Sequence, residues 1–483
     1  MIDLTNEMSI FEKSQKGTGA YSSELDYELE GVHETMLPPQ YMRQSVLELP
    51  DISERDIVKH FSNLASRTFS LDEHFYPLGS CTMKYNPKVN EDVAGLEEFL
   101  HLHPLQDESD IQGTLKILYE FEKELSFICG MDKFSLQPAA GAHGEVTSLL
   151  IAKKYFAKKN EKRTKIVVTD SSHGTNPASA RLAGFDLVTI TSKDGVVDLE
   201  SLQRECDSSL AVLMLTNPNT LGLFEEDVIK ICEMVHRCGG LTYQDGANMN
   251  ALLGLARPGD MGFDMMHVNL HKTFSTPHGG GGPGSGPVGV KHYLEDFLPV
   301  PFIEKDKDDF YKFNYGNEDS IGAVKSFWGN FGVILRASVY LDAIGLKGLK
   351  ETSKASIINA NYLKKKLSDT YLIPHEKPCM HEFVMMPDNK TVTTKTLDIA
   401  KRLLDFGIHS PTVYFPLIVK EAIMIEPTET ESKQVLDEFV CVMKLIASEA
   451  ANNPEKLKDA PFSTFRKRID EVTAARKPVL KWE

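Results

Sequence analysis

The chain has 483 residues, of which 41% are hydrophobic and 25% charged, and its formal net charge is -16 at pH 7. The acidic balance argues against a nucleic-acid-binding surface, because that kind of binding needs clustered cations. No apolar run approaches the ~20 residues of a membrane span, and the first residues lack the basic and apolar regions of a secretion signal. We therefore expect a globular, cytoplasmic protein with no membrane or nucleic-acid partner.

The seven cysteines are scattered along the chain and include no C-x-x-C pair. An odd number of cysteines without such a motif predicts reduced thiols rather than a disulfide framework or a zinc site.

The N-terminal stretch, residues 1–60, shows little periodicity and several turn signals. We expect an arm that either wraps around a neighbouring subunit or lies along the surface. A short amphipathic helix is predicted at 52–61, with Ser53 as its N-cap. Residues 76–87 are rich in small, hydroxylated and turn-forming side chains. Composition alone predicts a structural loop there.

Helices and strands alternate from about residue 113 onward. A helix at 114–129 is predicted to end at Gly130, and a second runs from the turn at 138–145 to about residue 159. Continuous apolar strands between helices indicate a mostly parallel sheet covered on both faces. Ligands of such sheets bind beyond the carboxyl ends of the strands. The predicted strands are 165–169, 186–191, 210–216 and 241–244.

The C-terminal third predicts a smaller domain. A long helix is expected from about 321 to 369, broken near Gly345 and Gly348, and it should connect a large domain to a small α+β domain. The tail carries several arginines and lysines, which are either solvated or contact an anion or a partner. The expected division is an arm at 1–60, a cofactor-binding large domain at 61–330, a small C-terminal domain at 331–450 and a tail at 451–483.

Lys272 is the residue that the sequence predicts to take part in the chemical reaction. It follows a short apolar strand, with His271 before it, Thr273 after it and a glycine-rich run at 279–289 beyond. Such a lysine can lose its proton and form a Schiff base, although a solvated loop lysine beside a flexible linker fits the same local pattern. Asp245 ends an earlier strand. A strand-end aspartate followed by a lysine is the arrangement that pyridoxal phosphate (PLP) requires.

Two further features have both an ordinary and a functional interpretation. His173 lies just past a predicted strand, where a histidine caps a loop or stacks on a planar cofactor. The turn at 138–145 places small residues at a helix N-terminus, which either is an ordinary loop–helix junction or binds a phosphate through free N–H groups and the helix dipole.

Several long motifs resemble one family, the glycine decarboxylase P-proteins, and specifically the C-terminal half of that enzyme. In organisms that split the enzyme, this half is a separate chain, subunit 2. The motifs extend over nearly the whole sequence. They are Ile10–Ser14, Pro77–Lys84, His173–Ser179, Asp245–Asn250, the Lys272 segment, Tyr414–Leu417 and Glu426–Glu431. The resemblance implies the aspartate-aminotransferase-like α/β fold of fold type I PLP-dependent transferases.

The resemblance also implies roles for the residues already singled out. Lys272 would form the Schiff base with PLP, and Asp245 would pair with the pyridine nitrogen. His173 would stack on the ring, and Asn248 would reach the ring hydroxyl.

The phosphate of PLP would be held by the backbone amides of Ala142 and His143 together with the His271 side chain. Many relatives carry glutamine where this chain has His143, which leaves the role of that side chain open but not the role of its amide.

The implied activity is the decarboxylation of glycine, followed by transfer of the aminomethyl group to the lipoyl arm of a small carrier, H-protein. The partner would be the homologous subunit 1, with two copies of each subunit. His271, His143, Ser80 or Cys81 could lie near the lipoyl arm, and the sequence does not rank them. How far the partner completes the site, and which groups bind the glycine carboxylate, is also left open.

Three other functions compete with this one. Another fold type I decarboxylase or lyase fits the cofactor motifs, and for a desulfurase Cys379 is the one cysteine in a plausible region. A non-catalytic scaffold would be expected to lack Lys272 or Asp245, and both are present. A P-loop nucleotidase is excluded because its phosphate-binding motif is absent.

Overall fold

A computed structural model describes residues 8–17, 38–45, 48–279, 284–388 and 394–480. The chain divides into two compact units, 1–70 with 462–483 and 71–461. The predicted division of the second unit into a large and a small domain at residue 330 stays a prediction. Much of the predicted arm and part of the glycine-rich run, 280–283, lie outside the described residues. Within the described ranges, no helix is long and apolar enough to cross a membrane.

The first unit consists of short helices from both ends of the chain. Ser53 caps its longest helix and accepts a hydrogen bond from the Asp56 N–H, as the sequence predicts. The Arg67 guanidinium lies 4.1 Å from the centre of the Phe465 ring, which joins the N-terminal part to the tail. The elements are α1 (Ile10–Lys13), η2 (Pro39–Tyr41), α2 (Glu54–Ala65) and α14 (Glu471–Arg476).

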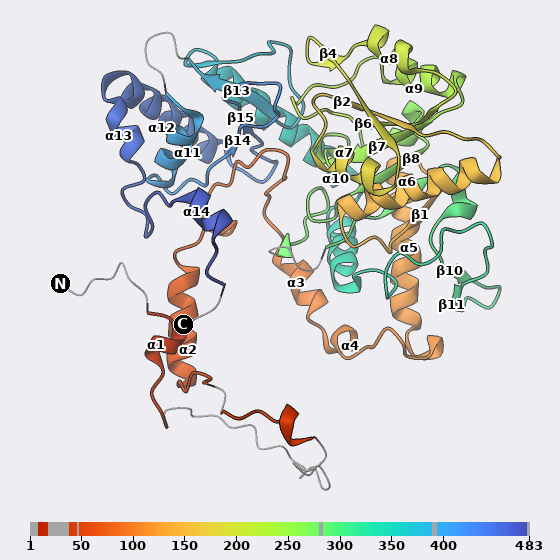
Figure 1. Cartoon of the computed structure of the whole chain (residues 1–483), viewed down its shortest axis with the longest axis horizontal. Coiled ribbons are helices and arrows are strands. Elements are labelled where there is room, and N and C mark those ends of the chain that lie inside the picture. Colours follow the sequence, from red (N-terminus) through yellow and green to blue (C-terminus); the bar gives the residue numbers. More distant parts are fainter. Residues whose placement is uncertain (1–7, 18–37, 46–47, 280–283, 389–393, 481–483) are drawn as a thin grey trace. The chain divides into compact units, whose positions relative to one another are not determined.

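A seven-stranded sheet forms the centre of the second unit, in the order β1-β9-β8-β7-β6-β2-β3 (Figure 1). The five strands from β8 to β3 are parallel, and β9 is antiparallel to both of its neighbours. The predicted mostly parallel α/β sheet is therefore confirmed. The strands are β1 (Lys133–Ser135), β2 (Lys165–Thr169), β3 (Asp186–Ile190), β6 (Leu210–Thr216), β7 (Leu241–Gly246), β8 (Met265–Val268) and β9 (Val288–Val290).

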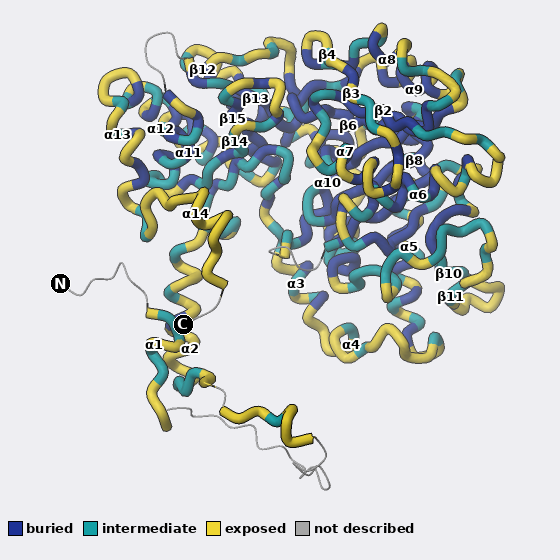
Figure 2. Tube along the Cα trace, in the orientation of Figure 1, coloured by how far each residue is buried: buried dark blue, intermediate teal, exposed yellow. Residues whose placement is uncertain are grey.

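Helices cover both faces of this sheet, so the central strands β2, β6, β7 and β8 are buried, whereas the edge strand β3 is partly exposed (Figure 2). Alternate residues of one strand belong to different cores: Val167 packs with α5 (Gln112–Cys129) and α9 (Val228–Arg237), whereas Ile166 packs with α6 (Gly141–Lys158) and α7 (Thr175–Leu182). This alternation is the two-residue period of a strand that is buried on both sides.

Shorter elements connect the large ones. The helix α5 ends at Gly130, whose φ of 70° is left-handed, as predicted. The remaining connecting elements are α3 (Lys88–Ala94), α4 (Glu97–Leu100), η3 (Glu108–Asp110), β4 (Ser192–Lys193), β5 (Val196–Val197), α8 (Leu199–Glu205), η4 (Met249–Ala251), η5 (Pro258–Met261), η7 (His292–Phe297), β10 (Phe302–Lys305) and β11 (Tyr311–Asn314).

The long helix α10 (Phe331–Leu367) leads into the C-terminal part of the unit. It breaks at Gly345, which has φ 60° and ψ 178°, where the sequence predicts a break. The break also predicted near Gly348 was wrong, because Gly348 stays helical. The prediction that it begins near 321 was wrong by about ten residues. Gly329, with a left-handed φ of 120°, precedes its N-cap Asn330, so the preceding residues cannot continue the helix.

Residues 71–370 of this unit are called the large domain below, and its C-terminal part, residues 371–461, the small domain. A four-stranded antiparallel sheet, in the order β12-β13-β15-β14, lies in the small domain with helices beside it (Figure 1). Its core contains Phe383, Ile425 and Phe439 together with Leu363 of α10. The elements are β12 (Tyr371–Leu372), β13 (Phe383–Pro387), α11 (Thr396–Leu404), β14 (Thr412–Val413), β15 (Ile423–Ile425), α12 (Lys433–Asn452) and α13 (Pro454–Asp459).

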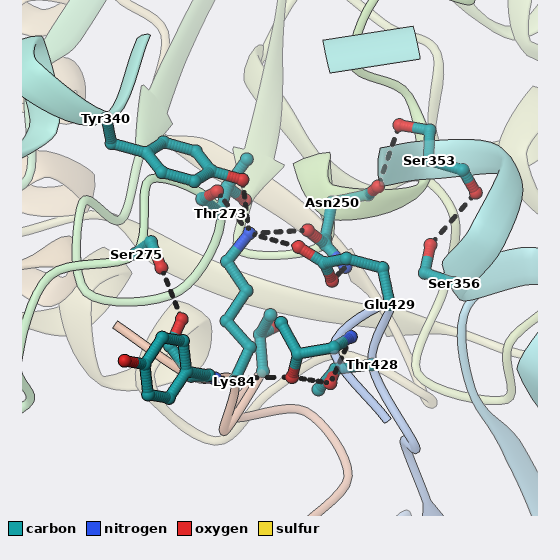
Figure 3. Close-up of polar contacts among 12 residues, drawn as sticks. Lys84, Asn250, Thr273, Ser275, Tyr340, Ser353, Ser356, Thr428 and Glu429 are labelled. Atoms are coloured by element: carbon teal, nitrogen blue, oxygen red, sulfur yellow. Dashed lines mark hydrogen bonds and ion pairs between the residues drawn. The ribbon is translucent and has the colours of Figure 1, made fainter. Parts of the chain in front are cut away.

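A buried lysine, Lys84, joins the two parts of the second unit (Figure 3). Its Nζ donates to Glu429 Oε1 at 2.8 Å, to the Thr273 carbonyl at 2.8 Å and to Asn250 Oδ1 at 3.2 Å. The Tyr340 hydroxyl of α10 lies 3.2 Å away. Burial alone would lower the pKa of Lys84, but Glu429 and Tyr340 outweigh burial and hold the pKa above its ordinary value. A charged lysine therefore fixes the segment that follows Lys272 against the small domain.

The backbones of the two parts also touch at Gly222, which follows β6. Its φ is 76°, and a Cβ built there would lie 1.9 Å from the carbonyl oxygen of Glu382, just before β13. The Gly222 carbonyl accepts a hydrogen bond of 2.7 Å from the Met380 N–H. No residue with a side chain fits this contact.

We predict that Gly222→Ala destabilises the protein far more than Gly407→Ala. Gly407 also has a left-handed φ of 70°, but among the described residues no atom beyond its chain neighbours lies within 4 Å of its built Cβ. Gly407→Ala should lower the free energy of unfolding by about 1–2 kcal/mol, through backbone strain alone. Gly222→Ala should cost about 3 kcal/mol or more, because overpacking adds to the strain. Urea unfolding of both variants measures this difference. Equal losses of unfolding free energy would show that the structure around Gly222 shifts easily to accommodate a side chain.

We predict that Lys84→Met lowers the free energy of unfolding by about 3–5 kcal/mol, because Glu429 is left as a buried charge without its cation. The matched control is Lys88→Met, since Lys88 pairs with Asp72 at 2.7 Å on the surface. The control should unfold almost as the parent does. Circular dichroism during urea unfolding compares the two, and a Lys84→Met variant as stable as the control would contradict the role given to this ion pair.

Candidate active site

The carboxyl ends of the parallel strands bring the predicted residues together. Lys272 follows β8, Asp245 lies near the end of β7, and His173 lies beyond the end of β2. The β7–β8 register places Asp245 opposite His267. His173 lies within electrostatic reach of both Asp245 and Lys272. Three segments separated by up to about a hundred residues thus form one site, where a parallel sheet is expected to bind its ligand.

Asp245 is a buried carboxylate, 3% exposed. Its Oδ2 accepts a hydrogen bond of 3.0 Å from Asn176 Nδ2, and its Oδ1 accepts one of 3.0 Å from the Ala247 N–H. Burial alone would raise its pKa, but the nearby His267, Asn176 and Lys272 outweigh burial, so the pKa lies below that of an ordinary aspartate. A negative charge is therefore stable at this strand end.

His267 is a residue of this site that the sequence analysis missed. Its Nε2 lies 3.6 Å from Asp245 Oδ1 and 2.9 Å from Asn269 Oδ1, while its Nδ1 is hydrogen-bonded to the Tyr243 hydroxyl. Burial lowers its pKa. A single histidine within the buried strand Met265–Val268 was the available signal, because an ordinary buried strand would carry an apolar side chain there.

A hydrogen-bonded chain leads from His173 into the core. His173 Nδ1 lies 2.8 Å from Thr175 Oγ1, which donates to Glu145 Oε1 at 2.6 Å. Ser179 Oγ donates to the other oxygen of Glu145 at 2.7 Å. Burial, and then the charge of Asp245, raise the pKa of Glu145 to about 7. The exposed His173 side chain is thereby oriented by buried groups.

The N-terminus of α6 lies against the same strand ends. Gly141 begins the helix, and a Cβ there would lie 2.2 Å from Asn269 Nδ2, so only glycine allows this approach. The predicted phosphate-binding amides of Ala142 and His143 lie in the first turn. His143 Nδ1 accepts a hydrogen bond of 3.1 Å from the Ala139 N–H. The side chain whose role the sequence left open therefore fixes the turn before the helix.

Two histidines lie beside Lys272. The rings of His271 and His278 meet edge to face, with centres 4.7 Å apart. Burial, each other's proximity and Lys272 lower the pKa of His271 to about 3, and burial with Lys272 lowers the pKa of His278 to about 4. Both rings are neutral at pH 7. In the part of the chain that the structure describes, His278 Nε2 is a buried atom without a hydrogen-bond partner.

Asn248, which the resemblance places near the ring hydroxyl, is buried. Its Nδ2 donates to the Pro218 carbonyl at 2.8 Å and lies 3.4 Å from Glu382 Oε1. The amide nitrogen is thus used inside the protein, and its role toward a ligand stays a prediction.

Three side chains of the small domain, and Cys81 of the loop at residues 76–87, also lie within electrostatic reach of Lys272. The charge of Lys272 acts on Cys81, His381, Glu382 and Glu426. Burial raises the pKa of the Cys81 thiol, so the thiol is protonated at pH 7. Apart from Cys81, this group was not assigned any role in the site from the sequence.

Comparison with protein families identifies two matching regions. The family described as "Glycine cleavage system P-protein" matches residues 25–315, and the one described as "Glycine dehydrogenase, C-terminal domain" matches residues 352–465.

Relatives match along nearly the full length. A protein of Caldanaerobacter subterraneus subsp. tengcongensis named "Probable glycine dehydrogenase (decarboxylating) subunit 2" is 56% identical over 98% of both chains. A protein of Thermotoga maritima with the same name is 53% identical over 98% of this chain and 100% of its own.

Solved structures share the fold. A glycine decarboxylase (P-protein) of the glycine cleavage system in inhibitor-bound form superposes with a TM-score of 0.73 at 20% identity, covering 85% of this chain and 94% of its own. A glutamate decarboxylase from Lactobacillus brevis gives a TM-score of 0.65 at 12% identity, covering 86% and 96%. The predicted fold type I, aspartate-aminotransferase-like fold is confirmed. With its family match over more than half of its length and its full-length relatives, this chain belongs to the glycine cleavage system P-protein family.

Proposed function

We propose that this chain is the lysine-bearing subunit of a PLP-dependent glycine decarboxylase, and that it works with a homologous subunit 1. The observation that carries the proposal is the grouping of Lys272, the buried charge of Asp245 and His173 at the ends of parallel strands in one sheet. The names of the relatives, glycine dehydrogenase (decarboxylating) subunit 2, supply glycine as the substrate and imply the second subunit.

The residues at this site fit PLP. Asp245 offers a buried negative charge that its neighbours stabilise, which is what a protonated pyridine nitrogen requires. The first turn of α6 presents N–H groups and the positive end of a helix of 18 residues to a phosphate. Near Lys272, His278 Nε2 has no partner among the described residues, so a hydrogen-bonding ligand would satisfy a buried group.

When bound, PLP supplies an electron sink for the carbon that loses carbon dioxide. Lys272 would hold the aldehyde of PLP and release it when the amine of glycine takes its place. Asp245 would keep the pyridine nitrogen protonated, and His173, held by Thr175 and Glu145, would lie against the ring. Because the rings of His271 and His278 are neutral at pH 7, they can donate hydrogen bonds to an anion without adding charge beside the Lys272 amine.

The aminomethyl group would pass to the disulfide of a lipoylated carrier, H-protein, through attack of carbon on sulfur. Two copies of each subunit would form the working enzyme. The partner's contribution to the site is best measured by mixing the subunits, because a single chain does not report it.

The desulfurase alternative finds no support in the environment of Cys379. This cysteine is 2% exposed, its N–H donates to Asn361 Oδ1 at 3.1 Å, and burial raises the pKa of its thiol to about 12. A sulfur-accepting cysteine must instead be an accessible thiolate on a movable segment. Decarboxylation of a different amino acid would leave the cofactor residues unchanged, so the substrate has to be tested directly.

We predict that glycine-dependent exchange of labelled bicarbonate, measured with lipoylated H-protein, appears when this chain is mixed with subunit 1 and is lost in Lys272→Ala. The loss should exceed about 1,000-fold, because the group that holds the cofactor is removed. Lys347→Ala, a change at an exposed position in α10, is the matched control and should retain full exchange.

Two results would contradict the proposal. Exchange that survives in Lys272→Ala would place the cofactor elsewhere. If no mixture shows exchange although the chain carries a borohydride-reducible chromophore, PLP would be retained and a different amino acid would be the substrate.

A further inference from the structure

Two glutamates of the small domain are forced together by strand register. The strands β13 and β15 are antiparallel, with Phe383 opposite Ile425. Glu382 and Glu426 each lie one residue beyond this pair, so the same register makes them cross-strand neighbours. Like charges at such positions destabilise a sheet. Both glutamates are nevertheless fully buried, at 0% exposure.

The two carboxyl groups lie close to each other and to His381. One oxygen of each, together with one ring nitrogen of His381, all lie within 4.8 Å of one another. His381 is also 0% exposed, and in the described part of the chain neither of its ring nitrogens has a hydrogen-bond partner. Burial lowers the pKa of His381 to about 3, so this histidine supplies no positive charge to the pair at pH 7.

The loop at residues 76–87 directs neutral donors at the pair. The Ser80 N–H donates to Glu382 Oε2 at 2.6 Å. Thr82 donates to both oxygens of Glu426, through its N–H at 3.0 Å and its hydroxyl at 2.7 Å. Ser80 and Thr82 have left-handed φ angles of 64° and 47°, which are uncommon for residues with a side chain and tend to occur at functional sites. The loop is thus held in a strained form that serves these carboxyl groups.

Few charged side chains among the described residues face Glu382 and Glu426. Lys272, from the large domain, acts on both carboxyl groups. Glu429 acts on Glu426 as a like charge, although its own partner is Lys84 at 2.8 Å. The neutral amide of Asn248, also from the large domain, lies 3.4 Å from Glu382 Oε1.

These surroundings decide the protonation of the pair. Burial and then the charge of Glu426 raise the pKa of Glu382 well above that of an ordinary glutamate, and burial raises the pKa of Glu426 to about 7. Lys84 balances Glu429, so the ammonium group of Lys272 alone faces two buried carboxylates and cannot balance both. The pair therefore holds at least one proton at pH 7, beside Lys272.

The proposed reaction needs a proton at this place. Zwitterionic glycine, the lipoyl disulfide and one proton give carbon dioxide, an S-aminomethyl ammonium group and one thiol. The carbon–carbon bond to the carboxylate breaks, a carbon–sulfur bond forms and the sulfur–sulfur bond breaks. The glycine carbon is oxidised, the disulfide is reduced, and the second sulfur leaves as a thiolate that takes up the proton.

On the basis of the proposed function, we propose that Glu382 and Glu426 share a proton and that Glu382 donates it to the leaving sulfur of the lipoyl disulfide. Among the described groups within electrostatic reach of Lys272, the histidine rings are neutral and Cys81 is a weak acid. Of these groups, the carboxyl pair holds a proton that it can donate. Solvent then restores the proton after each turnover.

The first test measures aminomethyl transfer in a single turnover, with labelled glycine, subunit 1 and lipoylated H-protein. In Glu382→Gln the transfer rate should fall by about 100-fold or more, because a positioned general acid is lost. The glycine concentration that half-saturates the change in cofactor absorption should stay the same, because the proton is needed only after glycine has bound. That spectral change also shows whether the variant is folded and loaded.

The variant Glu426→Gln gives a response that a merely structural role would not produce. Without the like charge of Glu426, the pKa of Glu382 falls. Glu382 donates only while it is protonated, so the decline of the transfer rate at high pH should begin at a lower pH than in the parent. Glu431→Gln is the matched control, because burial alone raises the pKa of Glu431 to about 7. Its rate and pH profile should match those of the parent.

The second test does not depend on activity. Infrared difference spectra of the parent against Glu382→Gln at neutral pH should show the C=O band of a protonated carboxylic acid that is present in the parent and missing in the variant. If the parent performs no transfer but shows this band, the proposed function fails and proton sharing stands.

Three results would overturn the inference. They are transfer by Glu382→Gln within threefold of the parent, an infrared spectrum of the parent without the acid band, or a bound divalent metal ion whose removal by a chelator is needed before the band appears.

Discussion

The buried negative charge of Asp245 is the constraint on which the rest of the site depends. A carboxylate at the end of a central strand is costly unless it is surrounded by donors and positive charge. The Asn176 side chain and the Ala247 N–H supply the donors, while His267 and Lys272 supply favourable electrostatics. In the proposed function the same arrangement would prepare the strand end for a cationic ring, because a charge stabilised before the ligand arrives needs little rearrangement afterward.

The small domain has the opposite effect on the carboxyl groups that it buries. Near Asp245 the protein stabilises a carboxylate, whereas at Glu382 and Glu426 two carboxyl groups face each other in a buried place with neutral donors. The pKa shifts therefore go in opposite directions: down at Asp245 and up at the glutamate pair. When two carboxyl groups in one site have different pKa values, the group with the lower pKa usually serves as a fixed negative charge and the group with the higher pKa as a proton donor.

The sequence was informative where the signal is local. The strand–helix alternation, the left-handed Gly130 and the segments that deliver Asp245 and Lys272 follow from residues that are neighbours in the chain, and the bounds of β2 and β6 match those predicted. The start of α10 was missed because a turn around Gly329 interrupts a pattern that looks helical from its side chains. The roles of the predicted site residues stay predictions.

The other residues discussed here could not be predicted, because their positions depend on contacts between segments that are far apart in the sequence. Glu382 and Glu426 are 44 positions apart by their numbers, and only the register of β13 and β15 reveals that they are neighbours. Lys84 looks like an ordinary loop lysine until its contacts with Glu429, Thr273 and Asn250 are seen. These residues lie where the small domain meets the large one, so a change that shifts one domain would alter the loop after Lys272 and the carboxyl pair together. The same few side chains thus hold the two domains together and lie near the proposed proton donor.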